Sequence, residues 1–354
     1  MEAIKQRYTT TPGHKGEAPE SRFITAVRTK TFLHLNRRKQ EDAIEPIQAV
    51  HIPQKDIERF YFRWPAFDRK KELKKLVNAG ELRIIEATTA NGRKIWLYKA
   101  LKDGPLDLGA LPVKTPVYDA LTLYMRDNLL LIGTTGPTTE YFDFFLEHRA
   151  RHLDHFFKVD NFAGRIHTPI TNLKGIYRST LTIEGEATNA LDVAQMQPQL
   201  LGWLLKKNVG PNPFSDILDQ GADIYEYIAE ALHLETRDQA KEKFYQITFA
   251  PPSNELEHLF GCQEWISWVN WLKGARVCEN PHSARKPHSN LAWLLQTEEV
   301  KLMRKVWARI QALDIPFATV HDEIIIPSSA TQAARQAMQE QLSAVFVKYR
   351  INHY

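Results

Sequence analysis

A stripe of cationic and aromatic side chains repeats every four residues between positions 237 and 249. It consists of Arg237, Lys241, Tyr245 and Phe249. Because residues four apart are neighbours on a helix, a helical segment would place these side chains on one face. Such a face is unusual for a core and suits a nucleoside triphosphate, with cations toward the phosphates and rings toward the sugar and base. The alternative is a basic amphipathic helix that packs its aromatic rings inward.

An acidic tripeptide, His321-Asp322-Glu323, separates two β-prone runs. A hairpin formed by these runs would expose both acids at its tip, although acidic turns commonly serve only solvation. A further carboxylate, Asp192, ends an apolar run that precedes a helix started by Pro198. At that position Asp192 is either a functional carboxylate at a strand end or an ordinary N-cap.

Taken in order, Asp192–Gln197, Arg237–Phe249 and His321–Glu323 resemble motifs A, B and C of the A-family DNA polymerases, the group of bacterial DNA polymerase I. Each motif is weak alone, but the ordered set is specific, and the resemblance covers about residues 160–350. It implies an α+β fold with the palm and fingers of a right-hand polymerase. It also implies template-directed nucleotidyl transfer, with a DNA template, a DNA primer and dNTPs as partners.

The resemblance extends to residues that contact the substrates. Those matched to primer–template contacts are Arg165, Asn172, Arg178, Gln296 and His321. Those matched to nucleotide contacts are Arg237, Lys241, Tyr245, Phe249, Gln197 and Tyr225, the last in place of the His of the family's Asp-Ile-His segment.

A magnesium-dependent mechanism also follows from the resemblance. Two Mg²⁺ ions would hold the attacking primer oxygen and the leaving pyrophosphate oxygen, with Asp192 and Asp322 as their ligands. The backbone carbonyl of Val193 is expected to add a ligand, and Glu323 is expected to give adjacent support. Lys241 would clamp the triphosphate and assist the departing pyrophosphate.

Two positions depart from the family pattern. Gln197 stands in place of the usual Glu of motif A, and Phe249 in place of the usual Tyr that ends motif B. In the family this Glu–Tyr pair crowds the 2′-OH of ribonucleotides, and Gln with Phe cannot form the same carboxylate–phenol hydrogen bond. We therefore predict relaxed sugar discrimination, with use of NTPs as well as dNTPs. Tyr245 occupies the site where an aromatic hydroxyl favours dideoxynucleotides.

The catalytic region is short, since only 130 residues separate Asp192 from Asp322. The residues before 160 leave no room for both a full thumb and a proofreading exonuclease, so we expect no proofreading. These features favour a primase-polymerase of a mobile element or phage, with a helicase or small accessory protein as a further partner. One alternative is a single-subunit phage-type RNA polymerase or dedicated primase. From a different class, the alternative is a non-catalytic DNA-binding protein with a polymerase-derived fold.

The N-terminal part of the chain predicts two further segments. Residues 1–40 hold nine Lys/Arg against three Glu and are interpreted as a basic arm for a polyanionic partner or for solubility. Residues 41–104 predict a winged-helix-like module, with a helix over 68–77 followed by two strands around Asn91-Gly92, a hairpin turn signal. A plain helix–hairpin unit without DNA binding is the alternative.

Two helices are predicted over 116–131 and 138–157, within a helical linker or reduced thumb at 105–158. Palm and fingers would then occupy 159–354. No apolar run approaches the ~20 residues of a membrane helix, so no membrane partner is expected.

Two cysteines, Cys262 and Cys278, fit a reducing cytoplasm better than a disulfide framework. Together with His282 and His288 they have irregular spacing and lack a Cys-x2-Cys knuckle. The pattern therefore favours buried thiols and surface histidines over a zinc site.

Overall fold

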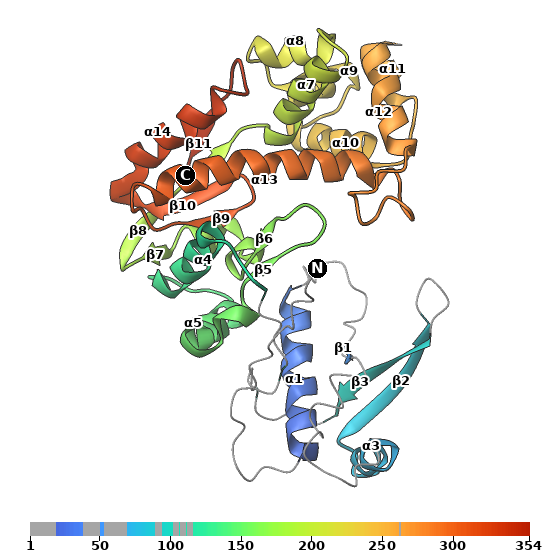
Figure 1. The fold of residues 1–354 in the computed structure, drawn as a ribbon, viewed down its shortest axis with the longest axis vertical. Helices are drawn as coiled ribbons and strands as arrows, with labels where there is room; N and C mark the ends of the chain where they lie inside the picture. Colours follow the sequence, from blue (N-terminus) through green and yellow to red (C-terminus); the bar gives the residue numbers. More distant parts are fainter. Residues whose placement is uncertain are drawn as a thin grey trace, which may run out of the picture. The chain divides into compact units, whose positions relative to one another are not determined.

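The computed structural model describes residues 19–37, 50–52, 69–88, 94–101, 106, 111, 116–261 and 263–354. The chain divides into two compact units (Figure 1). Unit 1 comprises residues 1–117 and 139–156, and unit 2 comprises residues 118–138 and 157–354. Helices and strands are mixed in the chain, which confirms the α+β class. No helix in the described ranges combines the length and apolar character needed to cross a bilayer.

Unit 1 is built on a small antiparallel sheet with strand order β1-β3-β2. Its elements are α1 (Pro19–Arg37), β1 (Val50–His51), α3 (Arg69–Asn78), β2 (Leu82–Thr88), β3 (Lys94–Ala100) and α5 (Glu140–His152). The predicted helix, glycine and hairpin are confirmed: Gly80, at φ 66°, follows α3, and β2 pairs with β3 along its whole length. Asn91-Gly92 lies outside the described residues, and DNA binding by this module stays a prediction.

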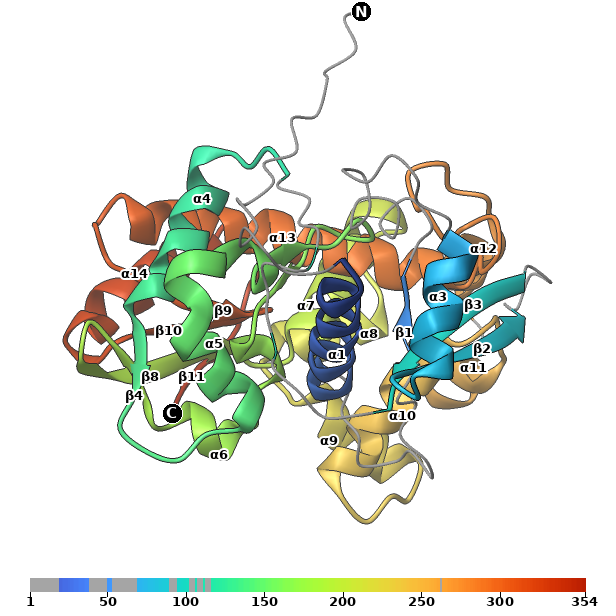
Figure 2. The same cartoon turned by 90° about the horizontal axis from the view of Figure 1, so that it is seen from below.

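The basic arm predicted for residues 1–40 is wrong for the segment that forms α1. Phe23, Ile24 and Val27 are at most 1% exposed and pack into a core with Leu76 and Tyr98. The rings of Phe23 and Tyr98 meet edge to face, with centroids 5.5 Å apart. Figures 1 and 2 show α1 alongside the β1–β3 sheet. Burial of these apolar side chains outweighs the solvation of the basic ones, so the segment is part of a domain.

The prediction that residues 105–158 form one helical linker or reduced thumb is also wrong, because the two helices of this segment belong to different units. Both helices exist, with tighter bounds. The first is α4 (Ala120–Asp127), continued by η3 (Asn128–Leu131), in unit 2, and the second is α5, continued by η4 (Leu153–His155), in unit 1. Asn128 Nδ2 donates to the Phe317 carbonyl at 3.1 Å, which anchors the α4 segment to unit 2.

A six-stranded sheet forms the floor of unit 2, in the order β4-β7-β8-β10-β9, with β11 paired to β8. Its strands are β4 (Ile132–Thr134), β7 (Leu181–Ile183), β8 (Glu186–Val193), β9 (Ala318–Val320), β10 (Glu323–Pro327) and β11 (Ile351–His353). A separate pair is formed by β5 (Lys158–Val159) and β6 (Ile166–His167). In the antiparallel register of β8 and β10, Ile324 lies opposite Leu191. Asp192, which follows Leu191, and Glu323, which precedes Ile324, therefore meet at one end of the sheet.

Helices make up the rest of unit 2. They are α6 (Gly175–Arg178), α7 (Met196–Asn208), α8 (Pro213–Asp219), α9 (Ile224–Ala231), α10 (Arg237–Phe249), α11 (Glu255–Phe260), α12 (Glu264–Gly274), α13 (Ser289–Gln311) and α14 (Thr331–Leu342), with short turns η5 (Ile170–Asn172) and η6 (Ser328–Ala330). Figures 1 and 2 show α13 running through unit 2, with α14 and the sheet at one end and α10 and α12 toward the other.

A buried lysine ties α12 to the last turns of α10. Lys273 is 1% exposed, and its Nζ donates to the Ile247 carbonyl at 2.6 Å. Burial penalises the charged amine and lowers the pKa of Lys273 to about 8. The bond holds α10 in place, at the expense of keeping an ionisable group out of water.

We predict that this lysine makes stability depend on pH. Between pH 8 and ~10.4, the ordinary lysine pKa, the unfolded chain binds the proton and the folded chain does not, so the free energy of unfolding rises with pH. The rise is about 3 kcal/mol at 1.36 kcal/mol per unit of pKa. Urea unfolding from pH 7.5 to 10.5 should show this rise in the wild type, relative to Lys273→Met. Lys305→Met, at an exposed position, serves as the control and should show the same rise as the wild type. The prediction would be contradicted if the free energy of unfolding of the wild type changed with pH in the same way as that of Lys273→Met.

Candidate functional site

A pocket of about 490 Å³ opens in unit 2 beside the end of the sheet and α10. It is lined by these residues: Arg165, Asp192, Val193, Ala194, Gln195, Met196, Gln197, Tyr225, Arg237, Lys241, Tyr245, Phe249, Gln296, Glu299, His321, Asp322, Arg350, Asn352 and Tyr354. Every predicted site residue is among them except Asn172, Arg178 and Glu323. Segments far apart in sequence therefore meet at one place, as the ordered motifs predicted.

The two predicted catalytic carboxylates reach the pocket from neighbouring strands. Asp192 lies near the end of β8, and Asp322 lies in the turn between β9 and β10. Burial, with the negative charges of Glu299 and Asp192, raises the pKa of Asp322 well above its ordinary value. The N-cap alternative for Asp192 is wrong, since α7 begins at Met196 and its N-cap is Gln195.

The α10 stripe lines the pocket along its length. The alternative of an inward-packed aromatic face is wrong for these rings, because the core-facing residues of α10 are Ala240, Phe244 and Ile247. Tyr245 and Phe249 instead stack on each other, with centroids 5.5 Å apart. The helix starts with a capping box from Thr236 and Gln239, as a helix N-terminus requires.

The two cations of the stripe differ in their partners. Arg237 Nε donates to Asp223 Oδ2 at 2.8 Å, and its guanidinium lies 4.8 Å above the ring of Tyr225. Lys241 is exposed and makes no ion pair with a described residue. Burial raises the pKa of Tyr225, which keeps its hydroxyl protonated. The α10 stripe thus offers one positioned guanidinium and one ammonium without an ion pair among the described residues.

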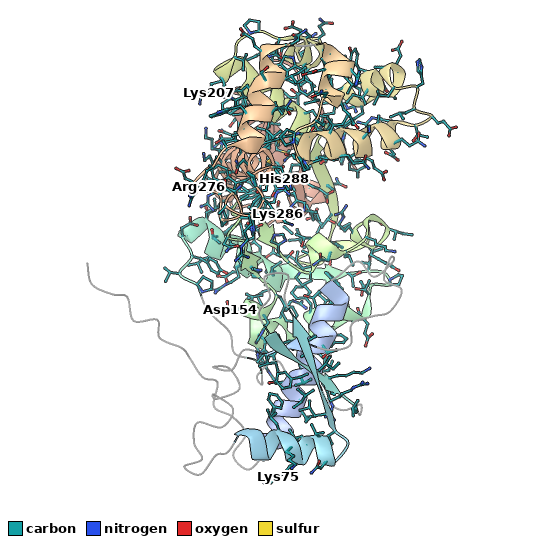
Figure 3. The ribbon with its side chains drawn as sticks, turned by 90° about the vertical axis from the view of Figure 1, so that its right-hand side faces the viewer. Lys75, Asp154, Lys207, Arg276, Lys286 and His288 are labelled. Carbon is teal, nitrogen blue, oxygen red and sulfur yellow. The ribbon has the colours of Figure 1, made fainter. Side chains whose placement is uncertain are left out.

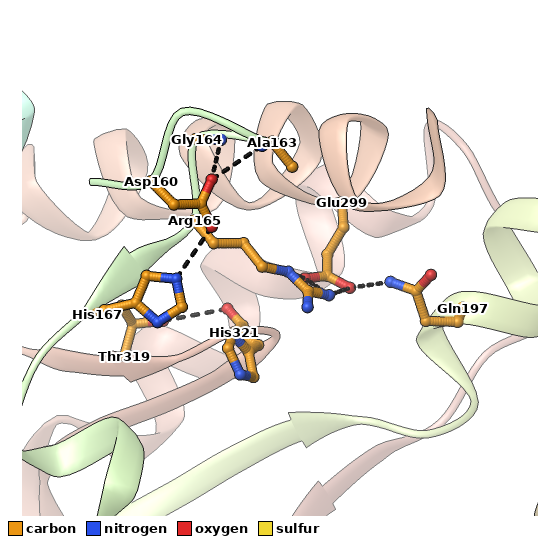
Figure 4. Close-up of polar contacts among 9 residues, drawn as sticks. All are labelled: Asp160, Ala163, Gly164, Arg165, His167, Gln197, Glu299, Thr319 and His321. Atoms are coloured by element: carbon orange, nitrogen blue, oxygen red, sulfur yellow. Dashed lines mark hydrogen bonds and ion pairs between the residues drawn. The ribbon is translucent and has the colours of Figure 1, made fainter. Parts of the chain in front are cut away.

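A buried glutamate, Glu299, was not predicted as a site residue. It is 2% exposed and accepts two bonds at its Oε1 from Arg165, from Nε at 2.9 Å and Nη2 at 2.6 Å, and a third at Oε2 from Nη2 at 2.8 Å (Figure 4). Gln197 Nε2 also donates to Glu299 Oε2. Burial raises the pKa of Glu299, against the opposing charge of Arg165. The sequence could have indicated Glu299 only through its spacing, because it lies three residues after Gln296 and therefore on the same face of that helix.

A tight turn fixes the residue that pairs with Glu299. Asp160 Oδ1 accepts from the backbone N–H groups of Phe162, Ala163 and Gly164 at 2.8–3.0 Å, and Oδ2 pairs with His167 Nε2 at 2.9 Å (Figure 4). Burial opposes ionisation of Asp160, but these hydrogen bonds lower its pKa on balance. Gly164 turns at φ 80° directly before Arg165. The turn therefore sets where the guanidinium enters the pocket.

Two buried polar atoms in the pocket lining have no hydrogen-bond partner among the described residues. They are Gln197 Oε1 and His321 Nδ1. Buried polar atoms without partners are costly, and are expected where a ligand or solvent completes the bonding. Burial lowers the pKa of His321 to about 4, so its imidazole is neutral.

Three predicted residues lie outside the pocket lining. Arg178 Nη2 pairs with Glu323 Oε2 at 3.4 Å, and burial raises the pKa of Glu323. Asn172 ends η5 and is exposed. Glu323 is therefore engaged by Arg178, and Asn172 is separate from the chemistry that the pocket can perform.

The last strand supplies lining residues that the sequence did not suggest. Pairing of β11 with β8 places Asn352 opposite Asp192, and Asn352 Nδ2 donates to Asp192 Oδ2 at 3.3 Å. Arg350 and Tyr354 flank it on the pocket. No local motif marks the segment 350–354, because its role depends on pairing with a strand ~160 residues earlier.

The cysteine–histidine cluster is described only in part. Cys278 is exposed, so the expectation of a buried thiol is wrong for it, and Cys262 lies outside the described residues. His282 is exposed and contacts the ring of Phe162. In the described part of the chain, no three or more His, Cys, Asp or Glu side chains are grouped as metal ligands.

Comparison of the sequence with known families and curated proteins identifies no relative. No family model matches the chain, and no curated protein is significantly similar to it. The functional interpretation therefore rests on the pocket geometry and on the ordered motifs of the sequence.

We predict that Glu299 holds this pocket together. Glu299→Gln leaves the Arg165 guanidinium buried without its carboxylate and should lower the free energy of unfolding by about 3–5 kcal/mol in denaturant titrations. The matched control is Glu298→Gln, whose surface pair with Lys301 is worth at most about 1 kcal/mol. Equal effects of the two substitutions would show that the buried pair has no special weight.

Proposed function

We propose that the chain is a template-directed nucleotidyltransferase, an A-family-like DNA polymerase without proofreading. The observation that carries this proposal is one pocket lined by Asp192, Asp322 and the α10 stripe. Carboxylates, cations and aromatic rings gathered in one pocket are the groups that a nucleoside triphosphate and a primer end require.

The α10 stripe would bind the incoming nucleotide. Lys241, which forms no ion pair within the described part of the chain, is available to the phosphates, while Arg237 is oriented by Asp223 and lies at the same face. The stacked rings of Tyr245 and Phe249 offer an aromatic wall to the sugar and base. This division of roles places the charge of the triphosphate toward the N-terminal turns of α10.

The acidic side of the pocket fits divalent cations. Burial, together with the negative charges of Glu299 and Asp192, raises the pKa of Asp322. Mg²⁺ prefers carboxylate oxygens of this kind as ligands. Asp192, Asp322 and the Val193 carbonyl would hold the ions. When bound, Mg²⁺ supplies charge neutralisation for the attacking and leaving oxygens.

Other side chains would position the primer end. Gln296 and Arg165 line the pocket beside Asp322, and the ion pair with Glu299 prevents the guanidinium from swinging. His321 is neutral and presents a partnerless Nδ1. Positioning of this kind, rather than proton transfer, accounts for most catalysis in phosphoryl chemistry.

One contact favours relaxed sugar selection. The Nε2 of Gln197 is engaged by Glu299, and the other polar atom of the amide, Oε1, is an acceptor with no partner among the residues that the structure describes. An amide acceptor can receive a hydrogen bond from a ribose hydroxyl without adding a negative charge. This supports use of ribonucleotides, and with it primer synthesis, more than strict exclusion of them.

We predict that catalysis requires the Asp pair. Asp322→Asn and Asp192→Asn should each lower primer extension with Mg²⁺ and dNTPs more than about a thousandfold, or ~4 kcal/mol, because the cation ligands are lost. Asp314→Asn removes an exposed carboxylate on the turn before β9 and is the matched control. Unchanged extension by Asp322→Asn would favour a non-catalytic DNA-binding protein.

We also predict that Gln197 sets the sugar preference. Wild-type kcat/KM for a ribonucleotide should lie within about a thousandfold of that for the matching deoxynucleotide, ~4 kcal/mol. Gln197→Glu places a carboxylate beside Glu299 and should shift the ratio toward deoxynucleotides, while Gln246→Glu on the exposed side of α10 should not. A strict deoxynucleotide preference in the wild type would refute relaxed selection.

A further inference from the structure

A basic loop of unit 2 has no role in the proposed reaction. Residues 275–288 join α12 to α13 and expose Arg276, Arg285 and Lys286, with Glu279 as the only acid. None of the three cations forms an ion pair with a described residue. Figure 3 labels Arg276 and Lys286 on this part of unit 2. The loop is therefore a positively charged surface.

Buried polar side chains hold this loop in one conformation. Asn280, Ser283 and Asn290 are 3%, 4% and 0% exposed. Asn280 Nδ2 donates to Ser289 Oγ at 3.0 Å and to Asn290 Oδ1 at 2.8 Å, and Asn290 Nδ2 donates to the Ala275 carbonyl at 2.8 Å. Buried amides are costly to leave without partners, so these bonds favour a single arrangement of the loop. The cations are presented from a fixed backbone.

Aromatic rings accompany the cations. Trp271 is 64% exposed on the last turn of α12, and its carbonyl accepts from the Ala275 N–H at 2.9 Å, directly before the loop. Within the loop, the ring of His282 lies 5.1 Å from that of Phe162. Free cations with exposed rings are the combination that binds single strands, through the phosphates and the base faces. Double-stranded DNA shields its base faces and would leave Trp271 without a partner.

The surface lies close to the pocket through α13. The loop ends where α13 begins at Ser289, and Gln296 on the same helix lines the pocket. At 1.5 Å per residue, the seven helical steps from Ser289 to Gln296 span about 10 Å, or about three steps of a stacked strand at 3.4 Å. A strand that leaves the pocket can reach the loop within a few nucleotides.

We propose that Trp271 and loop 275–288 bind single-stranded DNA, as the unpaired template just outside the pocket. The inference that this surface binds a single strand is based on its exposed cations and rings. The inference that this strand is the template rests on the proposed polymerase function.

The test is binding of a fluorescein-labelled single-stranded DNA oligonucleotide to the full-length protein, followed by anisotropy at several salt concentrations. Arg285→Ala/Lys286→Ala should weaken binding and reduce the slope of log K against log salt by about 1.4, at ~0.7 for each lost phosphate contact. Trp271→Ala should weaken binding at least about fivefold with the slope unchanged, because stacking releases no counterions. Lys207→Ala/Lys305→Ala removes two exposed lysines elsewhere in unit 2 and should leave the slope as in the wild type.

Equal losses in the two double variants would mean general attraction to the whole surface and would overturn the proposal. Tighter binding of a blunt duplex of the same length, with the same dependence on Arg285 and Lys286, would also overturn it. If the wild type extends no primer but the slopes differ as expected, the single-strand surface stands and only its role as a template site fails with the polymerase function.

Discussion

The structure of unit 2 depends on crowding three carboxylates at one end of a sheet. Asp192 and Asp322 arrive on adjacent strands, and Glu299 reaches them from α13. Burial above all, and then the negative charges of Glu299 and Asp192, disfavour ionisation of Asp322, which is why its pKa rises. The Arg165 guanidinium binds Glu299 through two of its nitrogens and so compensates one of the three charges. The remaining pair is left facing the pocket, where a cation would relieve its repulsion.

That compensation requires parts of the chain that are distant from the acids. The turn organised by Asp160 delivers Arg165, and Gln197 adds a second donor to Glu299 from the first turn of α7. A shift in the turn, in α7 or in α13 would therefore be felt at the same carboxylate. Because buried charges tolerate poor geometry badly, this network favours a single arrangement of the end of the sheet beside the pocket.

Much of the site was visible in the sequence because its signals are local. The four-residue spacing of the α10 stripe and the two β-prone runs around His321-Asp322-Glu323 specify a helix face and a hairpin without reference to the rest of the chain. The helix and hairpin of unit 1 were predicted for the same reason. The identification of these elements with polymerase motifs adds order along the chain, which a single motif lacks.

The misses have tertiary causes. Glu299 lies in a helix with several charged residues, and its burial and the approach of Arg165 distinguish it from its partly exposed neighbour Glu298. Asn352 joins the pocket through strand pairing across most of unit 2. The prediction of a basic arm over residues 1–40 was based on the charge count of the segment. It did not use the four-residue spacing of Phe23 and Val27, which places both on one face of α1. Net charge describes how a segment is solvated on average and does not indicate which side chains are buried.

A single helix gives the pocket and the basic loop a common frame. α13 carries Gln296 and Glu299 in the pocket, and the buried Asn290 near its first turn anchors the loop. A helix of 23 residues is stiff over the ~10 Å between these points. A strand held at the loop would therefore meet the pocket at a defined distance, without help from a separate domain. Under the proposed polymerase function, this arrangement would guide the template with few added residues.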